Sequence, residues 1–264
     1  MNLKILCQNL RQAGGKKERG TDNEASVRRY RFQWLGNKYD LDIVCMQEVN
    51  DLWKEMLRDD FREEYDMYYL YRGSLKGSNE AEPVMWKKEK YEKLEEGSFW
   101  LSETPDVPGS TSWQTACPRI CTWGIFKHKA SGKVFAFVNT HLDHRSLKAK
   151  ENGIKLILDN LSRFKNMPII LTGDFNSRPQ SNVYQATAKR LSDARHIAEK
   201  VIPGPNGTFH GYKFDPAAWR VKFPIDYIFV DKATVKVKTF QVINDYKNGK
   251  SSSDHFPVKA TVVF

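Results

Sequence analysis

The sequence has 264 residues, of which 40% are hydrophobic and 12% aromatic, and its formal net charge is +10. This length and composition allow one large buried core, so we expect a single domain over residues 1–264. The positive charge favours an acidic partner, such as nucleic acid, a phosphorylated metabolite or an anionic surface. Because the charge is spread along the chain, a solvated basic surface that serves solubility explains it equally well.

The start of the chain predicts neither a signal peptide nor a membrane span. The apolar run Met1–Cys7 leads straight into polar Gln8 and Asn9, which leaves it too short for either. We therefore expect a soluble, cytoplasmic protein, although a chain trimmed of its leader would look the same.

The four cysteines do not suggest a disulfide framework. Cys7 and Cys45 lie inside apolar strand-like runs, which is typical of free buried thiols. Cys117 and Cys121 would lie roughly 13 Å apart along a strand, beyond disulfide reach. This agrees with a reducing compartment.

Apolar runs typical of strands recur along the whole chain, with a few helical patterns between them and no linker or repeat. Many strands with few helices indicate a layered α/β sandwich rather than a doubly wound parallel sheet. The predicted strands are Leu3–Gln8, Leu41–Gln47, Met67–Tyr71, Pro83–Trp86, Ile120–Phe126, Val134–Thr140, Pro168–Leu171, Asp226–Val230, Val235–Ile243 and Val258–Phe264. The predicted helices and their apolar faces are Glu24–Tyr39 with Val27, Tyr30, Trp34 and Leu35; Leu52–Phe61 with Leu52, Met56 and Leu57; and Leu147–Phe164 with Leu147, Ile154, Ile157, Leu161 and Phe164.

Polar residues recur where the predicted strands end or begin. Because such positions can meet on one rim of a sandwich, we expect these side chains to converge. Asp-x-Asn after one strand and Asp-His before another can hold a divalent ion, orient a water and bind an anionic oxygen, as metal-assisted phosphoester cleavage requires. The residues are Asn9, Glu48, His141, Asp174, Asn176, Asp226, Asp254 and His255.

The motifs around these residues resemble, in order, those of the endonuclease/exonuclease/phosphatase superfamily, which has a deoxyribonuclease I-like fold. The resemblance implies a four-layered α/β/β/α sandwich, a divalent ion, usually magnesium, and phosphoester hydrolysis. The matching motifs are Gln8-Asn9, Gln47-Glu48, Asn139-Thr140-His141-Leu142, Gly173-Asp174-Phe175-Asn176, Ile225-Asp226-Tyr227-Ile228-Phe229 and Ser253-Asp254-His255-Phe256-Pro257-Val258.

The resemblance makes Glu48 the main carboxylate ligand of Mg²⁺, with Mn²⁺ as an alternative ion. Asn9 would lie beside the metal or the phosphate, and Asp254 would add a carboxylate near the metal. Asp174 would hold a second ion, and the sequence is compatible with one ion or two. Outside this family, Glu48 reads as a helix cap and Asn9 as a turn residue.

The remaining motif residues would carry the chemistry. Asp174 and Asn176 would position the attacking water and a phosphate oxygen. His255 would contact phosphate or water, with Asp226 holding its imidazole in one tautomer; either His255 or Asp174 is the general base. His141 would stabilise an oxyanion, and a His at this position is similar to deoxyribonuclease-like, deadenylase-like and sphingomyelinase-like members rather than apurinic endonucleases.

Several further residues have two interpretations each. Arg119 either reaches the substrate phosphate as a fixed cation or forms a surface ion pair. Asp143 either forms a polar pair with His144 at the pocket rim or caps a helix. The aromatic residues of 209–212 and Trp219 either stack on bases and sugar rings or pack in the core.

The segment Arg11–Glu24, with Lys16, Lys17 and Arg19, could fold over an anionic substrate. The sequence therefore predicts a monomeric magnesium-dependent phosphodiesterase, with nucleic acid or a nucleotide-like compound as first-choice substrate. The alternative is a phosphatase or phospholipase C-type enzyme acting on a sugar phosphate, an inositol phosphate or a sphingomyelin-type lipid. A binding module that has lost catalysis disagrees with the presence of Glu48, Asp174, Asn176 and His255.

Overall fold

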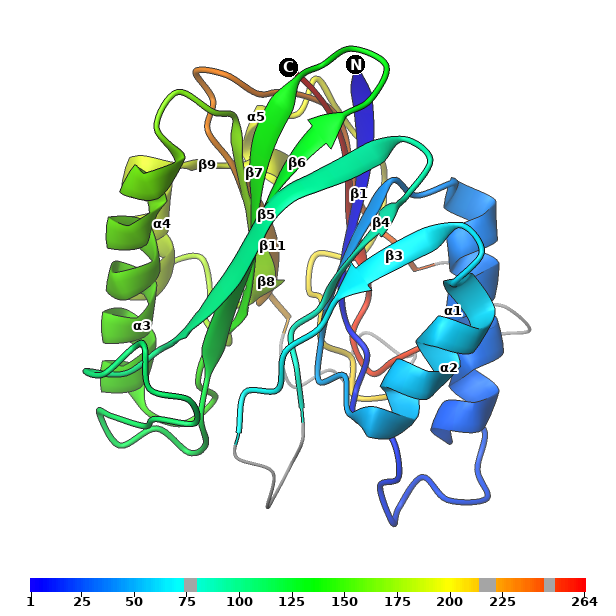
Figure 1. Ribbon diagram of the computed structural model, residues 1–264. Helices are drawn as coiled ribbons and strands as arrows, with labels where there is room; N and C mark the ends of the chain where they lie inside the picture. The colour runs from blue at the N-terminus through cyan, green and yellow to red at the C-terminus, as the bar shows by residue number, and fades with distance from the viewer. Residues whose placement is uncertain (74–79, 214–221, 245–249) are drawn as a thin grey trace.

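The computed structural model describes residues 1–73, 80–213, 222–244 and 250–264, and in it two β-sheets stack face to face with helices on both outer sides (Figure 1). Its elements are β1 Asn2–Asn9, α1 Ala25–Tyr39, β2 Ile43–Gln47, α2 Asp51–Phe61, β3 Tyr65–Tyr68, β4 Val84–Lys87, β5 Tyr91–Trp100, β6 Ile120–His128, β7 Val134–His141, α3 Leu147–Asn160, a 3₁₀ helix Leu161–Phe164, β8 Ile169–Asp174, α4 Asn182–Arg190, β9 Ser192–Asp193, α5 Ala194–Ile197, β10 Lys200–Val201, β11 Asp226–Val230, β12 Lys236–Val242 and β13 Val258–Val263.

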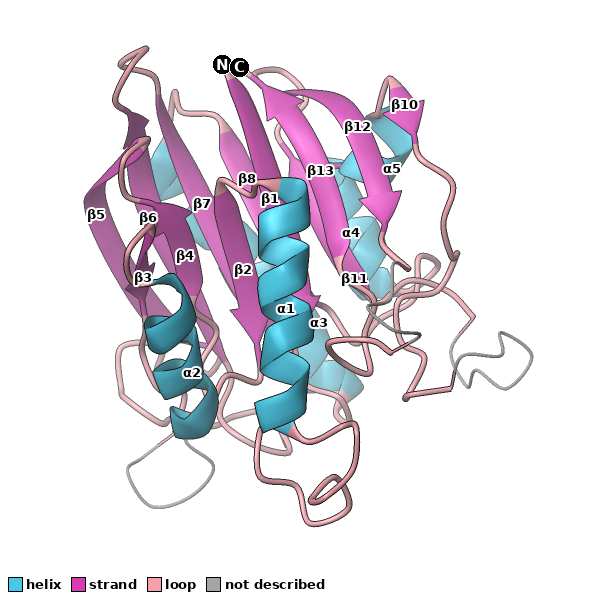
Figure 2. Ribbon diagram, turned by 90° about the vertical axis from the view of Figure 1, so that its right-hand side faces the viewer, coloured by secondary structure: helices cyan, strands magenta, loops and turns pink. Residues whose placement is uncertain are grey.

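The two sheets have seven and six strands. The seven-stranded sheet has the order β10-β12-β13-β1-β2-β4-β3, and the six-stranded sheet has the order β5-β6-β7-β8-β11-β9. Helices α1 and α2 lie in front of the seven-stranded sheet in Figure 2, and α3 and α4 lie on the outer side of the other sheet in Figure 1. The predicted four-layered α/β/β/α sandwich is confirmed.

Three apolar clusters hold the layers together. The cluster between the sheets includes Ile5 and Cys7 from β1 and Phe137 from β7. Leu6, on the opposite face of β1, belongs to a second cluster under α1 and α2, and a third cluster lies under α3 and α4. Because successive side chains of a strand point to opposite faces, a central strand covered on both sides must be apolar throughout. This explains the continuous apolar runs of the sequence.

The predicted apolar face of the first helix is only partly right, since Leu35 is buried and Trp34 packs against the same cluster but two other residues are exposed. Val27 and Tyr30 are 37% and 59% exposed, and α1 instead turns Arg28 and Arg31 inward with Phe32. The helix turns this way because its arginines hydrogen-bond loop carbonyls, which satisfies buried polar groups that water cannot reach.

These arginine bonds support the loops that carry site residues. Arg28 Nη1 donates to the carbonyls of Leu10 and, at 3.2 Å, Ser252, and Nη2 donates to that of Arg11 at 2.9 Å. Arg31 Nη1 donates to the carbonyl of Ser251 at 3.1 Å.

Two other predicted face residues are also exposed. Leu52 begins the predicted face of α2 and Leu147 that of α3, but they are 52% and 56% exposed. Both lie in the first turn of their helix, where α2 buries Trp53 in place of Leu52 and α3 buries Ala149 in place of Leu147.

The sequence did not predict strand β5 or helix α4. Strand β5 contains charged residues such as Glu95 and Glu96 because it is an edge strand that pairs only with β6 and has exposed positions. Helix α4 has no strong apolar pattern, although Ser181 caps it by accepting from the amide of Tyr184.

The four cysteines are free, as predicted, and Cys7 and Cys45 are buried. Among the described residues, no helix is long and apolar enough to cross a bilayer.

The strand registers bring the polar residues to one rim. β1 and β2 run parallel with Asn9 opposite Gln47, and β7 and β8 run parallel with His141 opposite Asp174. Strand β11 enters antiparallel, so that Asp226 at its start also lies opposite Asp174. The chain termini lie at the far end of the same strands, near the top of Figure 1.

Gly173 lets β8 approach β7 at this rim. Its φ is +152°, and a Cβ there would lie 2.1 Å from the carbonyl oxygen of Thr140. Only glycine avoids that contact, so the glycine of the GDFN motif sets the position of Asp174.

Candidate active site

A cavity of about 480 Å³ opens at the rim where the polar residues meet. Glu48, His141, Asp174, Asn176, Asp254 and His255 line it. Glu48 and Asn176 have φ values of 58° and 48°, a region that residues other than glycine seldom occupy. Such backbone strain is concentrated at functional sites, where it aims side chains.

His255 and Asp226 form a buried pair beside the cavity. The imidazole Nδ1 lies 2.9 Å from Asp226 Oδ2, and the side chain of Asp226 is fully buried. Burial alone would lower the pKa of His255, but Asp226, together with Asp174 and Asp254, outweighs burial and raises this pKa to about 10. The geometry therefore favours an imidazolium at neutral pH whose Nδ1–H donates to Asp226.

Asp174 lies at the centre of the site. Its Oδ1 accepts from the backbone N–H of Asn176 at 2.9 Å, and its Oδ2 accepts from Asn9 Nδ2 at 3.1 Å. His141 Nε2 and His255 Nε2 lie 3.5 and 3.9 Å from the same Oδ2. Burial, followed by the charge of Asp226, raises the pKa of Asp174 to about 7, although His255 opposes the shift. A carboxylate with this pKa can accept a proton at neutral pH.

Glu48 and Asp254 fit a divalent cation. Asn9 Nδ2 donates to Glu48 Oε1 at 3.0 Å, and the amide of Gln12 donates to Oε2 at 3.1 Å. Burial disfavours the charged form of Glu48, but the bond from Asn9 and the charge of His255 outweigh it and lower the pKa.

Asp254 would provide a second oxygen ligand. Burial raises the pKa of Asp254 and the charge of Glu48 adds to the rise, while His255 opposes both. Two carboxylates that repel each other at the edge of a cavity are the hard oxygen ligands that Mg²⁺ prefers. The donor chemistry therefore fits the expected ion.

Asn9 supports both halves of the site. Its single amide nitrogen donates to Glu48 and to Asp174, while its Oδ1 accepts from the amide of Arg11 at 2.9 Å. In this structure Asn9 positions the two carboxylates, and its role as a direct metal ligand stays a prediction.

Ligand atoms of Asp174, Asp226 and His255 also lie within 4.8 Å of one another, a grouping that is compatible with a metal ion. However, Asp226 Oδ2 and His255 Nδ1 lie 2.9 Å apart, so each of these two atoms already has a hydrogen-bond partner. This favours proton handling for these three residues and metal binding for Glu48 and Asp254.

His141 is held as a neutral imidazole. Burial, followed by the charges of Arg119 and Arg72, lowers its pKa well below the usual value. A neutral histidine with Nε2 directed toward Asp174 can donate a hydrogen bond to a phosphate oxygen without giving up its proton. This geometry supports the predicted role of His141 as an oxyanion stabiliser.

Two of the three arginines that line the cavity form close ion pairs with carboxylates. Arg11 Nε lies 3.0 Å from Glu18 Oε1, and Arg72 Nη2 lies 2.7 Å from Glu80 Oε2. The third is Arg119, whose Nε lies 4.0 Å from a carboxylate oxygen of Asp143. The overall charge of +10 is therefore not concentrated in this cavity.

Arg119 lies in the cavity wall rather than in a surface ion pair. Its side chain is 4% exposed, and Nη2 lies 3.1 Å from His144 Nδ1. Asp143 does not cap a helix, since Ser146 caps α3. Asp143 instead accepts from the amides of Ala116, Arg145 and Ser146, which fixes the loop before the helix.

The predicted aromatic residues divide between cavity and core. Phe209 lines the cavity with its ring centroid 4.9 Å from that of His255, whereas His210 is buried against Phe256. Trp219 lies outside the described residues. From segment Arg11–Glu24, Arg11 and Gln12 line the cavity, but its other basic residues do not.

The sequence did not identify Arg11, Arg72 or Glu80 as site residues. Arg11 follows Asn9 by two positions, so its closeness to the motif was a usable signal. Arg72 and Glu80 lie outside every motif, and only the pairing of Ala81 with Val49 and Tyr71 brings them to the rim.

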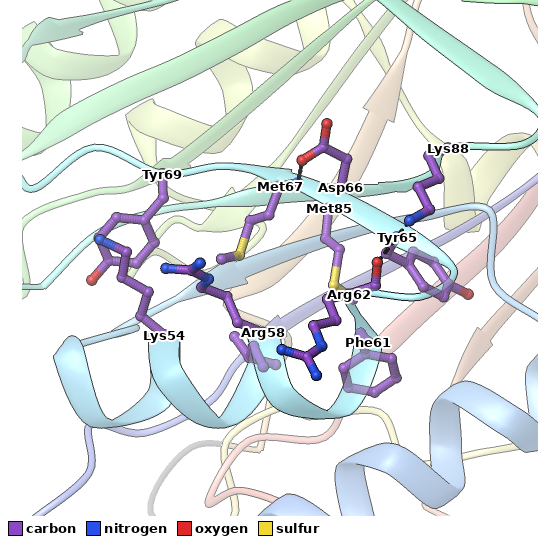
Figure 3. Close-up of a pocket in the computed structure, with 11 residues that line it drawn as sticks. Lys54, Arg58, Phe61, Arg62, Tyr65, Asp66, Met67, Tyr69, Met85 and Lys88 are labelled. Carbon is purple, nitrogen blue, oxygen red and sulfur yellow. Dashed lines mark hydrogen bonds between the residues drawn. The ribbon is translucent and has the colours of Figure 1, made fainter.

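A second cavity, of about 540 Å³, lies between α2 and strands β3 and β4 (Figure 3). It has apolar side chains at its base and basic side chains, including Lys54 and Arg58, projecting from α2. Its lining includes one carboxylate, Asp66, and no histidine. It lacks the acid–base groups of the rim cavity, which is therefore the candidate active site.

The fold and the rim residues are those expected of one known family. The chain belongs to the Endonuclease/Exonuclease/phosphatase family, which it matches over residues 24–255.

Known proteins of different specificity resemble the chain. An endonuclease/exonuclease/phosphatase of Bacteroides vulgatus superposes with a TM-score of 0.91 at 32% identity and covers 100% of this chain and 99% of that chain. A mannosyl-6-phosphatase of Bacteroides thetaiotaomicron superposes with a TM-score of 0.88 at 34% identity, with coverage of 99% and 100%. The CCR4-Not complex 3'-5'-exoribonuclease subunit Ccr4 of Candida albicans is 25% identical over 98% of this chain and 40% of its own length. The chain spans 35% to 63% of the length of the curated relatives it matches.

Proposed function

We propose that this protein is a magnesium-dependent phosphatase that hydrolyses small phosphomonoesters with a hydroxylated leaving group, such as sugar phosphates. The supporting observation is the cavity of about 480 Å³, in which Arg11 and Arg72 form close ion pairs with Glu18 and Glu80. A cavity of this size accommodates a small ligand. A polyanion would instead require unmatched cations along its backbone. The resemblance to the mannosyl-6-phosphatase over nearly the full length of both chains supports the same choice.

In the proposed mechanism, the chain's residues surround the phosphate with donors and one base. His141 and Asn176 donate to phosphate oxygens, and the imidazolium of His255, held by Asp226, stabilises the negative charge that develops on phosphorus oxygens. Asp174 orients the attacking water and accepts its proton, because its pKa of about 7 suits a general base at neutral pH. As the water oxygen bonds to phosphorus, the bond from phosphorus to the leaving-group oxygen breaks, and that oxygen takes a proton from solvent to leave as an alcohol.

Glu48 and Asp254 would hold the divalent ion, and Asn9 would keep Glu48 directed toward it. The ion would supply Lewis-acid stabilisation of the phosphate charge.

The test is a phosphate-release assay with a panel of substrates, carried out with Mg²⁺ and with EDTA. We expect sugar monophosphates to be cleaved with a kcat/KM at least ten times that of single-stranded oligonucleotides or bis-p-nitrophenyl phosphate, and EDTA to abolish cleavage. Preferential cleavage of oligonucleotides would contradict the proposal.

A nuclease is the second candidate and was the first choice from sequence alone. The observation that favours it is the net charge of +10 together with the similarity to Ccr4 subunits. The same panel decides between the two, since a nuclease shortens an oligonucleotide without needing a terminal phosphate.

We further propose that the chain acts as a single-domain cytoplasmic monomer. The two sheets share one apolar cluster, which supports a single folding unit. Free buried cysteines support a reducing compartment.

A further inference from the structure

Arg72 and Glu80 form part of the cavity wall, and the mechanism above uses neither of them. The amide of Arg72 donates to the carbonyl of Glu80 at 2.8 Å. Ala81 pairs with both Val49 and Tyr71, which fixes this segment next to the end of β2. The two side chains are therefore anchored one strand away from Glu48.

The two side chains form a close, nearly buried pair that still borders the cavity. Arg72 Nη2 lies 2.7 Å from Glu80 Oε2, with 6% and 7% of the side chains exposed. Both residues line the cavity with Glu48 and His141. A ligand whose phosphate lies at those catalytic residues would place its leaving group within reach of this pair.

Behind the pair lies Glu82, which is fully buried. Its Oε1 is 3.6 Å from Arg72 Nη1, and neither carboxylate oxygen has a hydrogen-bond partner among the described residues. Its carbonyl oxygen accepts from Thr122 Oγ1 at 2.6 Å and Asn139 Nδ2 at 3.2 Å, both in the six-stranded sheet. Glu82 is thus held by its backbone, and its carboxyl group, whose pKa burial raises to about 7, faces Arg72.

The charges of this wall determine what it can bind. Arg72 lies 2.7 Å from Glu80 and 3.6 Å from Glu82, so a second phosphate at Arg72 would have to compete with Glu80. A guanidinium beside a carboxylate offers donors next to an acceptor. Neighbouring hydroxyl groups, each of which donates and accepts, match such a surface.

We propose that Arg72 and Glu80 form a subsite that binds hydroxyl groups of the sugar moiety of a phosphomonoester substrate, and that Glu82 is a positioning residue that holds Arg72 in place. The inference rests on the proposed function and names the residues that select its leaving group. Burying an arginine between two glutamates has a large desolvation penalty. A guanidinium held in one fixed position can select the leaving group, which is the role that we give to this arrangement.

The test compares kcat/KM for a hexose 6-phosphate with that for p-nitrophenyl phosphate, whose leaving group carries no neighbouring hydroxyls. In Glu80→Gln and in Arg72→Lys, we expect the ratio of the two values to fall by roughly 10- to 100-fold, through a higher KM for the sugar phosphate. Glu82→Gln should lower the same ratio in the same direction. Glu92→Gln, at an exposed position of β5, is the matched control and should leave the ratio unchanged. Thermal unfolding of each variant identifies those that fail to fold.

The possible results distinguish failure of the proposed subsite from failure of the proposed phosphatase function. If the wild type prefers the sugar phosphate but folded Glu80→Gln and Arg72→Lys keep its ratio within threefold, the subsite is overturned and the phosphatase function stands. If the wild type hydrolyses p-nitrophenyl phosphate without preferring any sugar phosphate, the proposed function fails and the subsite with it.

Discussion

Replacing Asp226 with asparagine removes the charge that keeps His255 protonated. The asparagine amide oxygen can still accept from Nδ1 at the observed 2.9 Å, so the ring stays in place while the ion pair is lost. In the wild type the pKa of His255 is raised from 6.5 to about 10, a difference on the order of 5 kcal/mol between its charged and neutral forms. Without the charge of Asp226, less remains to offset the effect of burial on the imidazolium of His255. We expect the pKa of His255 to fall to roughly its ordinary value near 6.5.

The raised pKa of His255 determines how the effect of Asp226→Asn on kcat depends on pH. Because the pKa of His255 is raised in the folded protein, its stabilising contribution is complete below about pH 6.5 and is lost as the pH rises toward 10. In Asp226→Asn the imidazolium is already lost at pH 8, so we expect kcat there to fall by about 10² to 10⁴. At pH 6, where the ring is still protonated, the loss should be smaller.

Two measurements check this reasoning. NMR titration of the His255 ring nitrogens reports the pKa directly, and steady-state kinetics at pH 6 and pH 8 reports the consequence. Asp159→Asn, at an exposed position of α3, is the matched control. A ring that still titrates near 10 in Asp226→Asn, or an equal loss of kcat at both pH values, would refute the role given to Asp226.

Three further perturbations have definite expected results. Gly173→Ala should destabilise the fold by about 3 kcal/mol in denaturant unfolding, since its Cβ would lie 2.1 Å from a carbonyl oxygen at a φ of +152°; a fully stable and active variant would show that the close approach is dispensable. Arg28→Met should lower the free energy of unfolding by about 3 kcal/mol in the same experiment, because it leaves loop carbonyls without hydrogen-bond donors. A decrease below about 0.5 kcal/mol would contradict this expectation. His141→Ala should lower kcat by about 10² to 10³ with Mg²⁺ affinity unchanged in calorimetry; weaker metal binding would instead place His141 among the ligands.

Much of the fold was predictable because two covered sheets require apolar runs. Most predicted strands and helices exist close to their predicted bounds, but the predicted strand Met67–Tyr71 lies at Tyr65–Tyr68 and the predicted helix Leu147–Phe164 ends in a 3₁₀ helix from Leu161. The sequence did not predict edge strand β5, because its exposed positions do not need apolar residues. The prediction also failed in α1, where Arg28 and Arg31 are buried by hydrogen bonds to carbonyls from distant loops. No local pattern of apolar residues carries that information.

The candidate site was predictable where its residues lie in motifs at strand ends. Asn9, Glu48, Asp174 and His255 converge because strand register brings those ends together. The pairing of Arg72 with Glu80 and Glu82 was not predictable, because it depends on a bridge through Ala81 that has no sequence signal.

The size and charge of the cavity were also beyond the sequence. The net charge of +10 favoured an acidic partner without selecting one, whereas in the structure Arg11 and Arg72 of the cavity are closely paired with carboxylates. The positions of the basic residues in the structure are needed to tell whether they line the cavity or lie elsewhere on the surface.

The most direct test of the central claim is a Mg²⁺ titration of the wild type and Glu48→Gln, followed both by heat and by phosphate release from a hexose 6-phosphate. We predict that the wild type binds Mg²⁺ and that its activity rises with occupancy, while Glu48→Gln loses both. Unchanged Mg²⁺ binding in Glu48→Gln, or phosphate release that persists in EDTA, would contradict the account.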